Sequence, residues 1–406
     1  MITFIDYQYK GIGGVGQLIV NVTLELNRRG LKCKAYCSKE SFEYRRLADL
    51  SADFIHIDSD KVGIDEFKPY LDADDVIVLT HVFNTQLLEN IKELNNRVIF
   101  YSVHPQVFFN YNRWMDRLCN QKKHAIELVD LLYRNHALYI MDGPNLKALT
   151  DCGWHPESVD WLPVPVNNYT GESSKFLQAQ PLHITYLGRG NEDYKIYPLI
   201  KVLQDLNQSD TDCRLSIITD TNERFIELIK ELVPGNRIAV DYLNNLQGEA
   251  LDAYLLEQSS LHIAMGTSAL EGAKMGIPSI LIDWSEEEFP SNYRYRWLYE
   301  CDDYCLGAQI INGELPYDNG TTLADKIKEI STLQGFKAVS DSCREYVEKN
   351  HSIRSFTDTL LEADKRTTMT CRMYCRTRFS RNMKNIRPVI LKIGEIKRFI
   401  LRQNKQ

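Results

Sequence analysis

Short apolar runs that alternate with longer helical stretches constrain the fold of this chain more than any other feature. Each run is short enough to be a single β-strand. Strands of this kind, separated by helices, are typical of right-handed βαβ units and of parallel sheets buried on both faces. The sequence therefore predicts an α/β fold with strands at residues 2–7, 32–38, 52–58, 75–82, 97–104, 137–142, 182–188, 214–220, 237–243, 260–266 and 278–283.

The length of the chain predicts two domains. It has 406 residues, of which 44% are hydrophobic, and a single core stops growing at about 250–300 residues. A polar segment with proline at both ends, residues 163–181, separates the sixth apolar run from the seventh. We therefore expect two doubly wound, Rossmann-like domains that face each other across a cleft. The predicted bounds are an N-terminal domain at 1–165, a linker at 166–181, a C-terminal domain at 182–350, a helix returning toward the N-terminal domain at 351–365 and a basic tail at 366–406.

The most informative stretch is residues 259–283, where an apolar strand runs into Gly266, Thr267 and Ser268 and then into a helix that carries Glu271. Small hydroxylated residues at a helix start offer backbone N–H groups to a phosphate. A carboxylate one turn into the helix can accept hydrogen bonds from vicinal sugar hydroxyls. The stretch thus predicts a ligand-binding corner, although an ordinary strand-turn-helix with a capping Ser or Thr would have a similar pattern.

A second candidate feature follows the strand at 182–188. Gly188 and Arg189 end this strand, and Lys195 precedes the next helix. Arg can bind a diphosphate through two parallel hydrogen bonds, and Lys can act on it as a point charge. A solvated Arg and Lys in a loop are the alternative, but both features lie at strand ends of one predicted domain. We therefore expect them to converge on one cleft.

A glycine-rich segment, GIGGVG at 11–16, follows the first strand. Gly13 and Gly14 permit a tight turn and the close approach of a ligand to the backbone before an amphipathic helix. A dinucleotide fingerprint has an acidic residue at the end of a clean second strand, and this is not found here, because the strand ends in CSKE. We therefore do not expect a dinucleotide site here.

The cysteines and the acidic residues do not suggest a metal site or a cofactor. Three cysteine pairs are spaced by four residues, which suits neither a zinc knuckle nor a redox CxxC motif, and no His cluster accompanies them. Asp72, Asp74 and Asp75 precede their strand and resemble a capping turn. Scattered cysteines, no basic-then-apolar leader and no apolar run of ~20 residues predict a cytoplasmic protein with reduced cysteines.

The C-terminal end differs in charge from the rest of the chain. From Lys365 to Gln406 there are thirteen Lys and Arg residues against one acid, Glu395, which is a net charge of +12 in a chain of −7, so that the remainder carries −19. Apolar residues at helical spacing are interleaved with the basic ones. A basic amphipathic segment predicts binding of residues 366–406 to an anionic membrane surface. The alternatives are a nucleic-acid arm, which the acidic remainder opposes, and a helix that packs on the protein's own surface.

Together these motifs resemble the retaining glycosyltransferases of the GT-B fold, in particular glycosyltransferase family 4 (group 1) of bacterial polysaccharide and lipopolysaccharide assembly. The resemblance spans most of residues 1–365, and its matching pieces are GIGGVG, SVHPQ with His104, WLPVPVN, YLGRG with Arg189 and Lys195, and GTSALEGAKMGIPSI. In that family the second domain binds a nucleotide-sugar donor and the first binds the acceptor.

The resemblance also implies roles for individual residues. Arg189 and Lys195 would compensate the donor diphosphate, Glu271 would hold the ribose, and His104 would orient or polarise the donor sugar or the acceptor. His81, at the end of the adjacent strand, is the rival of His104. Residues implied to contact the donor are Gly13, Gly14, Gly188, Arg189, Lys195, Gly266, Thr267, Ser268 and Glu271.

The sequence departs from the family pattern at three places. The position eight residues before Glu271, where the family often has another Glu, is Ile263, so that sugar contacts would be absent or come from backbone at 265–268. The interval from Arg189 to Lys195 is one residue longer than the commoner spacing. Residues 283–300, with their acid run, match no family element.

These observations and the resemblance predict a metal-independent hexosyltransferase that uses no cofactor. Retention of the anomeric configuration is implied by the resemblance alone. The enzyme would transfer a sugar from a UDP- or GDP-type nucleotide sugar to a lipid-linked or oligosaccharide acceptor. It would act at the inner face of the cytoplasmic membrane and bind no nucleic acid. The alternatives are a sugar-nucleotide 2-epimerase of the same build, which needs acid/base carboxylates and His in the cleft, and a non-catalytic nucleotide-sugar-binding scaffold.

Overall fold

The computed structural model of the chain contains two compact units. Unit 1 comprises residues 1–163 and 356–406, and unit 2 comprises residues 164–355. The segment expected to be a linker, 166–181, belongs to unit 2. The structure describes residues 1–6, 13–80, 85–104, 120–176, 181–188, 190, 193–219, 223–233, 237–244 and 246–382.

Unit 1 is built on a six-stranded parallel sheet whose strands are in the order β3-β2-β1-β4-β5-β6. This is the order of a Rossmann fold, in which the chain direction across the sheet reverses between β1 and β4. All six strands lie where apolar runs predicted them. They are β1 (Ile2–Ile5), β2 (Cys33–Cys37), β3 (Ile55–Asp58), β4 (Val76–Leu79), β5 (Arg97–Ser102) and β6 (Leu138–Ile140).

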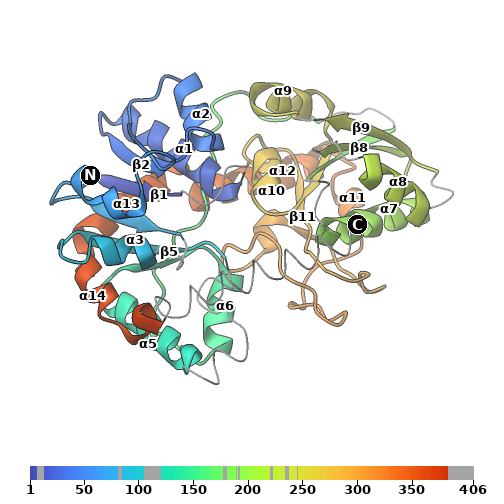
Figure 1. Cartoon of the computed structure of the whole chain (residues 1–406). Coiled ribbons are helices and arrows are strands. Elements are labelled where there is room, and N and C mark those ends of the chain that lie inside the picture. Colours follow the sequence, from blue (N-terminus) through green and yellow to red (C-terminus); the bar gives the residue numbers. More distant parts are fainter. Residues whose placement is uncertain are drawn as a thin grey trace, which may run out of the picture. The chain divides into compact units, whose positions relative to one another are not determined.

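Helices connect these strands and bury their apolar faces against the sheet (Figure 1). Ser41 and Asp142 cap two of them, because each side chain accepts a hydrogen bond from a backbone N–H of the first turn. The helices of unit 1 are α1 (Gly14–Arg28), α2 (Phe42–Asp49), α3 (Thr85–Asn90), α5 (Gln121–Arg134), α6 (Gly143–Asp151) and α14 (Cys371–Cys375), with short 3₁₀ turns at Ile64–Glu66 and Lys68–Tyr70.

Unit 2 repeats this topology. Its sheet has the order β12-β11-β10-β7-β8-β9, so the direction reverses between β7 and β10. Five strands were predicted, whereas the two-residue β12, which pairs antiparallel with β11, was not. The strands are β7 (Leu182–Leu187), β8 (Cys213–Thr219), β9 (Ala239–Asn244), β10 (Leu261–Ala264), β11 (Ser279–Leu281) and β12 (Arg296–Trp297).

The helices of unit 2 form two groups that contact within each group, one of α7, α8 and α11 and the other of α9, α10 and α12 (Figure 1). Two groups are expected of a doubly wound sheet, which is covered on both faces. Their bounds are α7 (Ile196–Gln208), α8 (Glu223–Leu232), α9 (Gly248–Gln258), α10 (Thr267–Ala273), α11 (Leu323–Glu329) and α12 (Leu333–Asn350), with 3₁₀ turns η4 (Asp193–Lys195) and η5 (Leu298–Glu300).

Helix α13 (Ile353–Arg366) begins in unit 2 and continues in unit 1, because the boundary between the units falls at residue 356. A helix over 351–365 was predicted from the sequence. Among the residues that the structure describes, no helix combines the length and the apolar character needed to cross a membrane.

The first part of the basic tail predicted at 366–406 is a component of the unit 1 core, which corrects the prediction that the whole segment is a tail separate from unit 1. The backbone of Met369 accepts a hydrogen bond from Val98, and the N–H of Cys371 donates to Asn96. The apolar side chains of this part are buried against α3 and α5, whereas Arg372, Arg376, Arg378 and Arg381 are exposed. Residues 383–406 lie outside the described residues.

We expect Phe379→Ala to lower the free energy of unfolding by about 3–5 kcal/mol, because it opens a cavity where the ring is 1% exposed. Arg378→Ala, at an exposed neighbouring position, is the matched control and should change stability by less than about 0.5 kcal/mol. Urea denaturation followed by circular dichroism measures both. Equal stability of the two variants would contradict the placement of this segment in the core.

Candidate functional site

The reversal of strand order in unit 2 brings two predicted features to one edge of one sheet. The parallel register sets Ala264 of β10 beside Leu187 of β7. Gly188 on one strand, and Met265 and Gly266 on the other, therefore leave the sheet side by side at its carboxyl edge. Doubly wound sheets bind their ligands outside this edge, at the point where the order reverses.

Gly266 turns the chain from β10 into α10 with a backbone conformation that only glycine adopts readily. Its φ is 65° and its ψ is −148°. A Cβ on this residue would meet open space, so the requirement for glycine comes from the backbone angle. Thr267, which is exposed, and Ser268, which is half-buried, follow as the first residues of α10.

His262 ties the start of α10 to the sheet. Its Nε2 lies 3.0 Å from the carbonyl oxygen of Ser268, and its Nδ1 lies 2.9 Å from the hydroxyl of Thr185. A carbonyl oxygen only accepts, so Nε2 carries the proton and Nδ1 accepts from Thr185. Burial lowers the pKa of His262 to about 4, and the ring therefore stays neutral near pH 7.

Gly272 lets α10 approach His262 closely. A Cβ at this position would lie 2.6 Å from Cδ2 of the imidazole ring, which is closer than packed atoms come. Neither His262 nor Gly272 was predicted as a site residue. An alternation of apolar residues around a single His does not distinguish a buried anchor from an ordinary strand residue.

Glu271 lies on α10 within an ion-pair cluster that the sequence analysis did not identify. Nζ of Lys274 is 2.5 Å from Glu271 Oε2 and 3.1 Å from Asp252 Oδ1. Burial alone would lower the pKa of Lys274, but the two carboxylates outweigh it and raise the pKa. The spacing of three residues between Glu271 and Lys274 in the sequence could have indicated this ion pair, because residues three apart on a helix are neighbours. The pair holds Glu271, which is 30% exposed, in a defined position.

The second predicted feature is described in part. Lys195 is half-buried at the start of α7, and its Nζ lies 5.7 Å from the centroid of the Tyr194 ring. The N–H of Gly188 donates to Ile218 of β8. Arg189 lies outside the described residues.

The segment after β11, for which the sequence suggested no role, is anchored by Asp283. This buried carboxylate accepts hydrogen bonds from the hydroxyls of Tyr293 and Tyr317, at 3.0 and 2.5 Å, and from the N–H of Ala308, at 2.7 Å. The guanidinium of Arg296 lies 3.5 Å from it. Residues 283–308 therefore form an anchored loop at the carboxyl edge of the sheet.

In unit 1, Gly13 and Gly14 begin α1 after β1, next to the reversal of strand order between β1 and β4. Asp6, directly after β1, was not predicted as a site residue. Burial, together with the nearby carboxylate of Glu43, raises the pKa of Asp6 to about 7. A carboxyl group with such a pKa at a strand end is characteristic of functional sites and also of buried acidic pairs.

His104 lies two residues after β5 and therefore one strand away from the reversal between β1 and β4. Desolvation lowers the pKa of its imidazole. His81, its rival, follows β4 but lies outside the described residues. The structure therefore places His104 beyond the end of β5 without assigning it a role.

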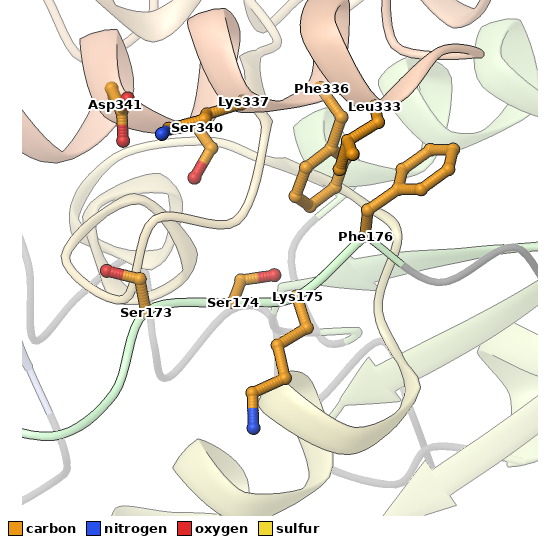
Figure 2. A pocket seen from close by; sticks show the side chains of 9 residues that line it. All are labelled: Ser173, Ser174, Lys175, Phe176, Leu333, Phe336, Lys337, Ser340 and Asp341. Atoms are coloured by element: carbon orange, nitrogen blue, oxygen red, sulfur yellow. The ribbon is translucent and has the colours of Figure 1, made fainter.

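A surface pocket of about 600 Å³ lies elsewhere in unit 2 (Figure 2). Figure 2 shows Leu333 and Phe336 of α12 on one side and Phe176 facing them, with the rings of Phe176 and Phe336 5.5 Å apart. The lining residues are Ser173, Ser174, Lys175, Phe176, Leu333, Phe336, Lys337, Ser340 and Asp341. None of them is a predicted site residue, so this pocket is distinct from the candidate site.

Comparison with known proteins establishes the fold. No protein-family model and no curated protein matches the sequence. Among solved structures, a glycosyltransferase from Rickettsia africae matches with a TM-score of 0.60 and 14% identity, over 90% of this chain and 97% of that one. The chain has the fold of the GT-B glycosyltransferases.

Two further GT-B structures match over a similar extent. HepE of Anabaena, solved in complex with UDP and glucose, has a TM-score of 0.56 and 11% identity, over 89% of this chain and 98% of its own. TarM of S. aureus, a mutant of which was solved with UDP and alpha-GlcNAc-glycerol, has a TM-score of 0.55 and 9% identity, over 89% and 99%. Identities this low show a shared fold, and a shared fold by itself does not determine function.

We expect unit 2 to lose stability as the pH falls from 6.5 toward 4, because the unfolded chain then binds protons that the neutral His262 does not. His262→Gln should remove part of this dependence, up to roughly 3 kcal/mol between pH 7 and pH 4. His155→Gln, at an exposed position, is the control and should leave it unchanged. Urea denaturation at several pH values measures the difference, and identical pH profiles of all three proteins would contradict the role of His262.

Proposed function

We propose that this chain is a hexosyltransferase that moves a sugar from a nucleoside-diphosphate sugar to a saccharide acceptor in the assembly of a cell-surface polysaccharide or glycolipid. The observation that carries the proposal is the placement of Gly188, Lys195, Gly266 and Glu271 around the reversal of strand order in unit 2. The similarity to glycosyltransferase structures over nearly the whole chain supports it. The donor is of UDP or GDP type.

The proposed donor site uses the corner between β10 and α10. Glu271, held by Lys274, accepts hydrogen bonds from the two ribose hydroxyls, and Thr267 and Ser268 lie against the phosphates or the sugar. Ile263, which occupies the position of the family's other Glu, is fully buried inside the sheet and does not contact a ligand. Contacts to the sugar therefore come from residues outside β10.

Transfer needs positive charge on the leaving diphosphate and an oriented acceptor hydroxyl. In our proposal Lys195 and Arg189 supply this charge without a metal ion. Gly13 and Gly14 of unit 1 lie under the reacting sugar, and His104 orients the sugar or the acceptor. Retention of the anomeric configuration rests on the resemblance to family 4 alone.

We further propose that residues 383–406 hold the enzyme on the inner face of the cytoplasmic membrane, where a lipid-linked acceptor is available. They contain seven Lys and Arg residues against one acid, with apolar residues between them. This segment replaces the longer one, 366–406, because the residues before 383 belong to the core of unit 1.

The donor site is tested by calorimetric titration of the purified protein with UDP, GDP, dTDP, CMP and ADP and their sugars, with and without EDTA. We expect binding of UDP or GDP that survives EDTA. Glu271→Gln should weaken it about 10-fold or more, since it removes a charge-assisted hydrogen bond worth roughly 1.5–3 kcal/mol. Lys195→Ala should weaken binding and also depress transfer.

Matched controls separate the site from the surface charge of unit 2. Glu257→Ala and Lys230→Ala remove exposed charges at the ends of α9 and α8 and should bind as the wild type does. Binding in the site variants that equals that of these controls would refute the site. No binding of any nucleotide to the wild type would favour a scaffold protein.

Removal of residues 383–406 should release the protein from liposomes that contain anionic lipid without affecting nucleotide binding. Because the truncation leaves Phe379 in place, the unfolding transition should be unchanged. Sedimentation with anionic and with neutral liposomes measures the effect. If the truncated protein still sediments with the anionic liposomes, the segment is not the anchor.

A further inference from the structure

Two aromatic side chains meet at the carboxyl edge of the unit 2 sheet. The ring centroids of Tyr194 and Trp284 are 5.4 Å apart and their planes are inclined by 63°. Tyr194 belongs to η4, after β7, and Trp284 lies three residues after β11. Such an edge-to-face contact is favourable in itself, and its position at the carboxyl edge of the sheet indicates a role in ligand binding.

The pair lies close to the end of β10. In the sheet, β10 lies between β11 and β7, and two strand spacings correspond to about 10 Å. The N–H of Gly266 donates to Leu306, and the N–H of Trp284 donates to Ala308 two residues further along, so the aromatic pair lies close to the end of the central strand. Met265 and Gly266, which begin the corner at α10, emerge from that central strand.

The backbone of Trp284 is fixed on both sides. Its N–H donates to Ala308 at 3.0 Å, and its carbonyl oxygen accepts from the N–H of Ile310 at 2.9 Å. The preceding residue, Asp283, is the buried anchor of the loop. Because successive side chains of an extended chain point to opposite sides, the burial of Asp283 directs Trp284 away from that buried cluster.

The burial of the neighbouring aromatic residues supports a role in binding. Tyr293, Tyr295 and Trp297, from the same segment, are at most 4% exposed. Trp284 and Tyr194, by contrast, remain half-buried. A fixed and partly accessible indole at a ligand-binding edge has the properties of a platform.

We propose that Trp284, supported by Tyr194, is the subsite for the pyranose ring of the nucleotide sugar. The face of an aromatic ring is electronegative, and the C–H bonds on one face of a pyranose are weakly electropositive and apolar. The two faces therefore stack and exclude water. The platform supplies the sugar contact that Ile263, inside the sheet, does not make.

This inference rests on the proposed function, and it makes a separate prediction. A platform for the sugar contributes to the binding of a nucleotide sugar and not to the binding of the free nucleoside diphosphate. The probes are therefore two pairs of compounds, UDP with UDP-glucose and GDP with GDP-mannose, titrated calorimetrically into the full-length protein. The pair that binds the wild type is used for the variants.

We expect Trp284→Ala to weaken binding of the nucleotide sugar about 10-fold and to change binding of the diphosphate less than about 2-fold. Trp284→Leu keeps apolar bulk without a ring face and should show the same selective loss. It serves as a second test in case the Ala variant does not fold. Trp284→Phe should restore most of the affinity. Gln309→Ala, at the exposed residue that bridges to Trp284, should resemble the wild type.

The outcomes distinguish the platform from the proposed function. An equal loss for sugar and diphosphate in the Leu variant, or no loss for either, overturns the platform while the nucleotide site stands. Failure of Trp284→Phe to recover affinity also overturns it. If the wild type binds neither member of either pair, the proposed function fails, and the platform fails with it.

Discussion

The parallel pairing of β7 with β10 is the constraint on which the candidate site depends. These strands are separated by about seventy residues of sequence, yet the register sets their carboxyl ends level. Every feature of the site, from Gly188 and Lys195 on one side to Gly266 and Glu271 on the other, takes its position from this pairing. A shift of the register by one residue would turn His262 to the opposite face of the sheet and would detach α10 from its anchor.

Buried polar groups hold the site as much as apolar packing does. His262, Asp283 and Lys274 are each taken out of water at a cost, and each has partners that offset it. Apolar contacts allow small slides, whereas a buried hydrogen-bonded group accepts few arrangements. The corner at Gly266 and the loop that carries Trp284 are therefore rigid supports, as a binding site requires.

The two units share one sheet topology but have different residues around the reversal of strand order. In unit 2 the reversal of strand order is surrounded by glycine turns, a cation and an anchored carboxylate. In unit 1 it is surrounded by Gly13, Gly14 and the carboxyl group of Asp6, whose raised pKa reflects burial beside Glu43. This difference is consistent with the proposal that unit 2 binds the anionic nucleotide-sugar donor.

Much of the fold was predictable, because continuous apolar runs bounded by turns have few other solutions than buried parallel strands. Of the twelve strands in the described part of the chain, eleven were found in this way. The exception, β12, has two residues and exists because Asp283, Arg296 and Tyr317 hold a long loop against β11, a contact between residues far apart in the sequence. The Gly266 corner was also found, since its residue types are unusual beside a strand.

For the basic tail, the local sequence pattern does not reveal what the segment packs against. Its basic and apolar residues predict an amphipathic segment, and residues such as Cys371, Tyr374 and Phe379 do have one apolar face. Whether that face meets lipid or the protein's own core depends on a vacant surface beside α3 and α5, which no short stretch of sequence reveals.

The sequence by itself determined the α/β class, the two domains and the residue types at the strand ends, because these follow from local periodicity and composition. Only the tertiary structure decided that His262 supports α10, that Lys274 holds Glu271, and that Trp284 meets Tyr194 close to the end of β10. The physical reason is that hydrogen bonds, ion pairs and ring contacts act over a few ångströms, and folding alone brings residues so far apart in the chain within that distance.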